Sequence, residues 1–76
     1  MAKKLPIKNT IRRLRFDANE MTQQALAEKV GVTRQTILAI EAARYSPTLE
    51  LAFKIAEVFG KELGEVFEYV PEGEDS

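Results

Sequence analysis

The chain has 76 residues and a mass of 8.6 kDa, the size of one small domain. Hydrophobic residues make up 45% and charged residues 30% of it, a composition typical of a soluble globular protein rather than a disordered one. It has no Cys and no His, which excludes disulfides and cysteine zinc sites and removes the commonest general base. We therefore expect no enzymatic activity, no metal, no cofactor and no small-molecule ligand.

The charges are divided unevenly along the chain. The net charge is −1, but residues 1–44 carry nine Lys/Arg against four Asp/Glu, a net of +5, and residues 45–76 carry two against eight, a net of −6. Such a split can present a positive face to nucleic-acid phosphates, although a solvated surface followed by an acidic tail would give the same count.

We expect neither a secretory signal nor a membrane-spanning segment. The N-terminal Met-Ala-Lys-Lys lacks the apolar run and cleavage site of a secretory signal. No stretch approaches the roughly 18 apolar residues of a membrane span. These features and the lack of Cys favour a cytoplasmic protein with no membrane partner.

Apolar spacing and helix breakers predict five short helices and no strand, an all-α fold. Apolar residues recur at intervals of four, three and four from Ile7 to Ala18, so the first helix is predicted there, with Pro6 near its start. The apolar positions of this stripe are Ile7, Ile11, Leu14 and Ala18.

Threonines and glycines mark the next two helices. Thr22 is expected to cap a second helix that ends at Gly31. Thr33 is expected to cap a third helix that runs to about Ala43. The residues expected to face the core are Leu26, Ala27, Val30, Ile37 and Ile40.

The last two helices follow the segment Arg44-Tyr45-Ser46-Pro47. The fourth is expected to start at Thr48 and end at Gly60, and a short fifth to span about 62–67. The inward-facing residues predicted here are Leu49, Leu51, Ala52, Ile55, Ala56, Phe59, Leu63, Val66 and Phe67. Residues 1–70 are thus predicted to form one domain, followed by an acidic, disordered tail at 71–76.

The informative stretch runs from Gln23 to Glu41, Q-Q-A-L-A-E-K-V-G-V-T-R-Q-T-I-L-A-I-E, with two short helices on either side of a brief turn. Packing them steeply requires a small residue at the crossing, Ala27, and a turn residue free to adopt unusual φ, Gly31. This motif, with A-A-R-Y-S-P-T-L-E-L-A-F-K-I-A after it, resembles the Cro/C1-type (Xre) helix-turn-helix transcription regulators. The resemblance implies a compact five-helix, lambda-repressor-like DNA-binding domain.

Two features depart from the family pattern. The linker from Phe16 to Met21 is one residue longer than the commonest spacing. Ala42-Ala43 replaces the usual Asn-Gly after Glu41. These departures affect the loops rather than the fold.

The resemblance implies that the third helix, about Thr33–Ala43, lies in the DNA major groove. The base-contacting residues that it implies are Thr33, Arg34, Gln35, Thr36, Leu38 and Ala39. Side-chain chemistry agrees, because Arg can bind guanine and Gln adenine bidentately, while Thr or Ala can contact a thymine methyl group. The alternative is that Arg34 and Gln35 are solvated surface residues.

Five residues outside the base-contacting set are assigned two different roles. Gln23, Arg44 and Tyr45 are candidate phosphate contacts, with capping or loop roles as the alternative. The family pairs the positions of Arg15 and Glu41 in a partly buried salt bridge, so we assign these two residues a structural role.

We interpret the chain as a sequence-specific transcriptional regulator that binds double-stranded DNA at a pseudo-palindromic operator as a homodimer. Phe67, Tyr69 and Val70 are expected to form the dimer seam or to cap the monomer core. The acidic C-terminal third motivates an alternative function, a protein-interaction module or antitoxin-like partner on the same fold. That alternative predicts the loss of polar base readers on the third helix, where Arg34 and Gln35 are present.

Overall fold

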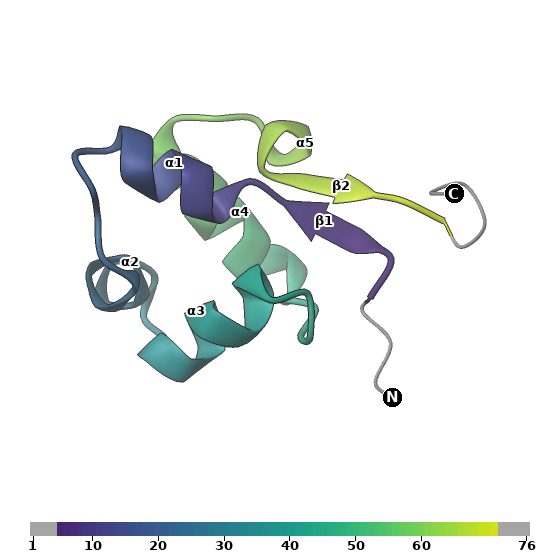
Figure 1. Cartoon of the computed structure of the whole chain (residues 1–76), viewed down its shortest axis with the longest axis horizontal. Helices are drawn as coiled ribbons and strands as arrows, with labels where there is room; N and C mark the ends of the chain where they lie inside the picture. The colour runs from purple at the N-terminus through teal and green to yellow at the C-terminus, as the bar shows by residue number, and fades with distance from the viewer. Residues whose placement is uncertain (1–4, 72–76) are drawn as a thin grey trace.

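Five helices and two short strands follow one another along residues 5–71, the part of the chain that the computed structural model describes (Figure 1). The elements are β1 (Ile7–Asn9), α1 (Ile11–Asp17), α2 (Gln23–Val30), α3 (Arg34–Glu41), α4 (Leu49–Phe59), α5 (Leu63–Val66) and β2 (Phe67–Tyr69). The five predicted helices and the mostly helical, helix-turn-helix fold are confirmed, whereas the prediction of no strand is wrong because a two-stranded sheet is present. The predicted disordered tail lies outside the described residues from position 72 onward.

The sheet joins the two ends of the described chain. β1 and β2 are antiparallel, and the opposed pairs are Ile7 with Tyr69, Lys8 with Glu68 and Asn9 with Phe67. The backbone N–H of Val70 extends the pairing by donating to the carbonyl of Pro6 at 2.7 Å. Figure 1 shows this two-stranded sheet projecting from one side of the helices.

The predicted start of the first helix at Ile7 is therefore wrong. Ile7 lies in the strand, and the helix begins only at Ile11, after Thr10. Thr10 is held by the other end of the chain, since its N–H donates to the carbonyl of Val66 at 2.9 Å. An interval of four residues between Ile7 and Ile11 fits one continuous helix, but it also fits a strand that is followed by a helix. The spacing therefore does not distinguish the two structures.

The predicted caps of α2, α3 and α4 are confirmed. The hydroxyls of Thr22, Thr33 and Thr48 each accept a hydrogen bond from the N–H three residues on, at 2.9, 3.3 and 3.1 Å. Gly31 and Gly60 end α2 and α4 with φ of 80° and 65°, the left-handed region that favours glycine. Local capping thus sets the length of these three helices.

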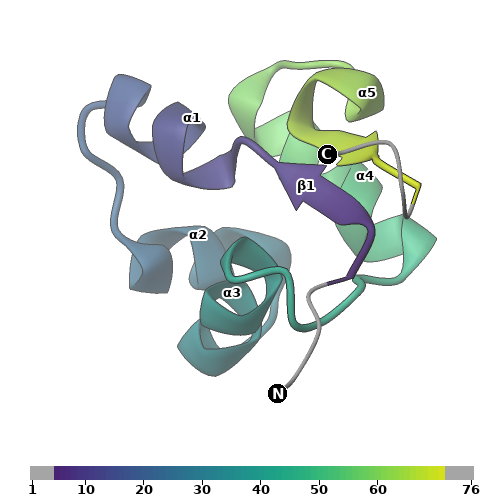
Figure 2. The same cartoon turned by 45° about the vertical axis from the view of Figure 1, so that its right-hand side comes forward.

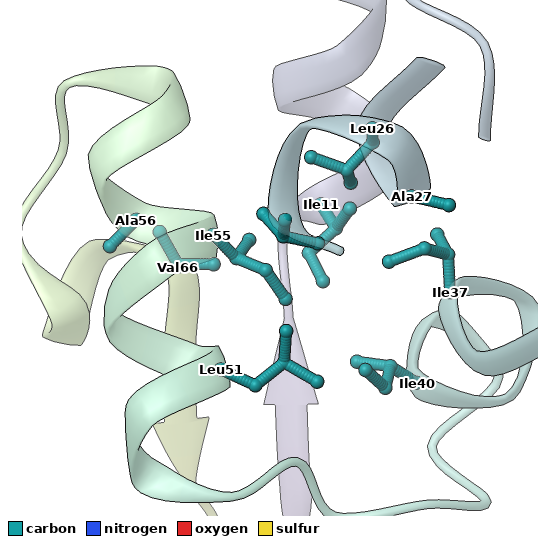
Figure 3. Close-up of a cluster of buried hydrophobic side chains, with 10 residues drawn as sticks. Ile11, Leu26, Ala27, Ile37, Ile40, Leu51, Ile55, Ala56 and Val66 are labelled. Carbon is teal, nitrogen blue, oxygen red and sulfur yellow. The ribbon is translucent and has the colours of Figure 1, made fainter. Parts of the chain in front are cut away.

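One apolar core holds the helices together (Figure 3). Its labelled members in that view are Ile11, Leu26, Ala27, Ile37, Ile40, Leu51, Ile55, Ala56 and Val66. The inward-facing prediction fails at Leu49, which is exposed. Leu49 lies in the first turn of α4, on a different side of the helix from Leu51 and Ile55.

α3 ends at Glu41, two residues earlier than predicted, because the chain turns sharply after it. Ala43 takes φ of 59°, and the N–H of Arg44 donates back to the carbonyl of Ala39 at 2.9 Å. The Cβ of Ala43 is unfavourable in this left-handed conformation. The family that the sequence resembles has a glycine here, so this turn is strained by its alanine.

Ala43→Gly should therefore raise the free energy of unfolding by about 1 kcal/mol, because glycine adopts this φ without a Cβ clash. In a domain of this size the melting temperature should rise by roughly 4 to 8 °C. The matched control is Ala42→Gly at φ of −84°, which should lower stability by about 0.5 to 1 kcal/mol. Lower melting temperatures for both variants would show that Ala43 is not strained.

Candidate nucleic-acid interface

α2 and α3 form a helix-turn-helix unit across the turn at residues 31–33. The N–H groups of Gly31 and Val32 both donate to the carbonyl of Ala27, at 2.8 and 3.0 Å, which closes α2 tightly. Figure 1 looks along α2 while α3 runs across the view, so the two helices cross steeply. Leu26 and Ile37 are fully buried at this junction, and they fix α3 against α2.

The core contacts of α3 determine which of its side chains face outward. Ile37 and Ile40 are buried, so the opposite side of the helix centres on Gln35. Arg34 and Gln35 are exposed in the first turn, and Leu38 is 42% exposed one turn later. The structure thus places these three predicted base-contacting residues on the outer part of α3.

The other three predicted base-contacting residues are less free. Thr36 and Ala39 are half-buried. Thr33 is exposed, but its hydroxyl caps α3 and lies 3.1 Å from the hydroxyl of Thr36. If the hydroxyl of Thr33 or Thr36 contacts DNA, the same hydroxyl also takes part in this local hydrogen bond.

A carboxylate at the end of α3 ties together the elements around the unit. Arg15 of α1 binds Glu41 with two bonds, Nε to Oε2 at 2.6 Å and Nη2 to Oε1 at 3.1 Å. Nη1 of Arg15 donates to the carbonyl of Met21 at 2.8 Å. The side chains of Arg15 and Glu41 are only 15% and 10% exposed. The partly buried salt bridge that the resemblance implied is confirmed.

The same carboxylate also holds Gln23, the first residue of α2. Nε2 of Gln23 donates to Oε1 of Glu41 at 3.3 Å. No sequence pattern predicts this bond, because two residues 18 positions apart meet here only through the crossing of α2 and α3. One N–H of the amide remains available to a phosphate, and the bond to Glu41 orients it.

Arg44 and Tyr45, the other two predicted phosphate contacts, are exposed in the loop between α3 and α4. Figure 2 shows α2, α3 and the loop after α3 along the lower side of the view, with α1 and α5 above them. The predicted contacts thus lie on the elements that share this side of the domain.

The charges of the structured part follow the same division. The cations on or beside the helix-turn-helix unit are Lys29, Arg34 and Arg44. The acidic residues of the C-terminal part lie on or next to α4, α5 and β2: Glu50, Glu57, Glu62, Glu65 and Glu68. The unit also carries Glu28, which accepts a hydrogen bond from Gln24, and Glu41, which is paired with Arg15, so the cations that an anion meets beside α3 are Arg34 and Arg44.

Within residues 5–71, no group of three or more His, Cys, Asp or Glu side chains could hold a metal ion. The helices in that range all fall short of the length and hydropathy that a membrane-spanning segment requires.

Known proteins share this arrangement. The chain matches the Helix-turn-helix family model over residues 11–66. It is 53% identical over 51 residues to an uncharacterized HTH-type transcriptional regulator of Methanocaldococcus jannaschii, covering 67% of this chain and 77% of that protein. It is 44% identical over 61 residues to YgzD, an uncharacterized HTH-type transcriptional regulator of Bacillus subtilis, covering 80% and 91%.

A solved structure has the same fold. It is the crystal structure of a "putative DNA-binding protein" from Bacteroides fragilis, with a TM-score of 0.71 and 22% identity. The match covers 82% of this chain and 98% of that one. The likeness therefore extends over nearly all of the Bacteroides protein.

Proposed function

The chain belongs to the Cro/C1-type (Xre) helix-turn-helix family, and from this we propose that it is a sequence-specific DNA-binding transcriptional regulator acting in the cytoplasm. One observation carries the proposal. The first turn of α3 presents Arg34 and Gln35 to solvent, while Ile37 and Ile40 fix the helix in the core. A rigid helix with exposed polar residues at its N-terminal end is the arrangement that reads base edges in the major groove.

The proposed base contacts are the six residues predicted from the sequence: Thr33, Arg34, Gln35, Thr36, Leu38 and Ala39. Arg34 supplies a guanidinium fork for O6 and N7 of guanine, and Gln35 supplies an amide for N6 and N7 of adenine. Their exposure supports this assignment, because neither side chain is needed by the core.

The proposed phosphate contacts are Gln23, Arg44 and Tyr45. Gln23 stands at the N-terminus of α2, where free backbone N–H groups favour an anion. Arg44 brings a positive charge just beyond α3. We propose that residues 1–70 form the DNA-binding unit and that 71–76 form an acidic tail.

We also propose that the protein binds as a homodimer, to inverted half-sites centred about 34 Å apart. Of the three residues predicted for the seam, Phe67 packs against the core and Val70 is half-buried. Tyr69 is 68% exposed, and Leu49 and Phe53, one turn apart on α4, are 66% and 54% exposed.

Figure 2 shows the first turn of α4 and the C-terminal end of β2, drawn in yellow, on the same side of the domain. We therefore assign the seam to Leu49, Phe53 and Tyr69. Within residues 5–71, such a seam would cover three of the large exposed apolar side chains. The others are Phe16 on α1 and the two that we assign to DNA contacts, Leu38 and Tyr45.

Selectivity among bases tests the function. A preferred duplex is first selected from a random DNA pool, and the affinity of each variant is then measured across all single-base changes. Arg34→Ala and Gln35→Ala should each cost about 1 to 3 kcal/mol on the preferred site and relax the choice at one base pair per half-site. Arg44→Ala should weaken all sequences nearly equally.

Two results would count against this assignment. Equal weakening of every duplex by Arg34→Ala and Gln35→Ala would make these residues phosphate contacts rather than base readers. Failure to enrich any duplex would contradict the proposed function and favour a protein-interaction role for the same fold.

A further inference from the structure

The outer face of α3 changes in character after its first turn. Gln35 is at the centre of that face, and the next outward positions along the helix are Leu38, Ala39 and Ala42. The polar side chain near the end of the helix, Glu41, is instead held by Arg15. Beyond the first turn, the outward stripe therefore offers only apolar side chains.

Leu38 is the largest group on this stripe, and the core does not use it. It is 42% exposed, although its neighbour Ile37 is fully buried. Its side chain has no hydrogen-bond donor or acceptor, so it cannot read the polar edge of a base. The apolar feature of the major groove is the C5-methyl group of a pyrimidine.

We propose that Leu38 recognises a 5-methylpyrimidine in the operator, with Ala39 and Ala42 beside it. The inference rests on the proposed function, and it names the chemistry that the second turn of α3 reads. Two bases carry this group, thymine and 5-methylcytosine.

The position of Leu38 along α3 places the methyl group relative to the other contacts. Leu38 follows Arg34 by four residues, a rise of about 6 Å. Successive base pairs are about 3.4 Å apart. The methylated pyrimidine should therefore lie one or two base pairs from the base read by Arg34.

The size of the effect follows from burying one methyl group. Removing a methyl group from an apolar contact of this kind should weaken binding about fourfold. Ala39 and Ala42 are half-buried, and each carries only a methyl side chain, so Leu38 is the largest apolar group offered to this contact.

The test uses the selected duplex with one half-site altered at a time. If selection places thymine at the position, deoxyuridine in its place should lower the affinity about fourfold, since only the methyl group is lost. If selection places cytosine there, 5-methylcytosine should raise the affinity about fourfold. The two arms thus identify which base supplies the methyl group.

Variants of Leu38 assign the effect to this residue. Leu38→Ala should bind the methylated and unmethylated duplexes equally, whereas Leu38→Met, which keeps an apolar side chain, should still discriminate. The exposure of Leu38 means that both variants should remain folded, which thermal melting checks.

The outcomes separate this inference from the function on which it rests. If no methyl change alters wild-type affinity while Arg34→Ala still relaxes base choice, the methyl contact is wrong and the regulator function stands. If Leu38→Ala discriminates as well as the wild type, another residue reads the methyl group and the assignment is overturned. If the wild type selects no duplex, the proposed function itself fails.

Discussion

Glu41→Ala should lower the free energy of unfolding by about 3 to 5 kcal/mol, because it leaves the guanidinium of Arg15 largely buried without its counter-charge. The pair is bidentate, and its two side chains are almost enclosed. A domain of 76 residues has a total stability of about 4 to 11 kcal/mol, so the variant should be close to unfolding. Denaturant unfolding of the wild type and the variant measures the difference.

A matched control lies on α1, the helix that carries Arg15. Arg13 pairs with Asp17 at 3.7 Å, but these side chains are 82% and 57% exposed. Arg13→Ala should change stability by less than about 0.5 kcal/mol, since solvent screens an exposed pair. A loss from Glu41→Ala no larger than this would show that the Arg15–Glu41 pair does not brace the fold.

Glu41 also connects the fold to the proposed DNA surface. Its Oε1 accepts hydrogen bonds from both Arg15 and Gln23, so one carboxylate holds α1 and the start of α2 against α3. The proposed phosphate contact of Gln23 is therefore oriented by the same group that stabilises the domain. Neither Arg15 nor Glu41 needs to contact a base for DNA binding to depend on them.

Helices α2, α3 and α4 could be predicted from the sequence because their capping signals are local. Thr22, Thr33 and Thr48 each bond an N–H three residues away, and Gly31 and Gly60 adopt the left-handed conformation within one residue of a helix end. Such signals depend on neighbouring residues rather than on the rest of the chain.

The sheet could not be predicted in this way. β1 and β2 have three residues each, and the pairing joins Ile7 to Tyr69 across nearly the whole chain. Three residues are too few to reveal alternation, and the pairing depends on the helices bringing both ends together. The match to the family model covers residues 11–66 and so also leaves out both strands.

The candidate site was predictable to a different extent at each residue. Helical periodicity places Arg34 and Gln35 outward once Ile37 and Ile40 are assigned to the core. The bond from Gln23 to Glu41 depends on the crossing of α2 and α3, which periodicity does not specify. DNA binding by these residues stays a prediction.

Loss of the dimer should have the largest effect on operator binding. Leu49 and Phe53 lie in the first two turns of α4 and are mostly exposed in the monomer. The double variant Leu49→Asn and Phe53→Asn should therefore keep the monomer fold while removing the proposed seam. Truncation before Phe67 would be less informative, because it would remove β2 from the sheet.

The double variant should sediment as a monomer and bind the two-half-site operator about 10² to 10⁴ times more weakly, because the second half-site is no longer held at high effective concentration. Its affinity for an isolated half-site should stay at the wild-type value, since α3 is unaltered. The matched control is Phe16→Asn on α1, which also replaces an exposed phenylalanine but should leave the protein dimeric. An intact dimer in the double variant would move the seam to another surface, and equal losses on both DNA substrates would mean that these residues act on DNA contact rather than on dimerisation.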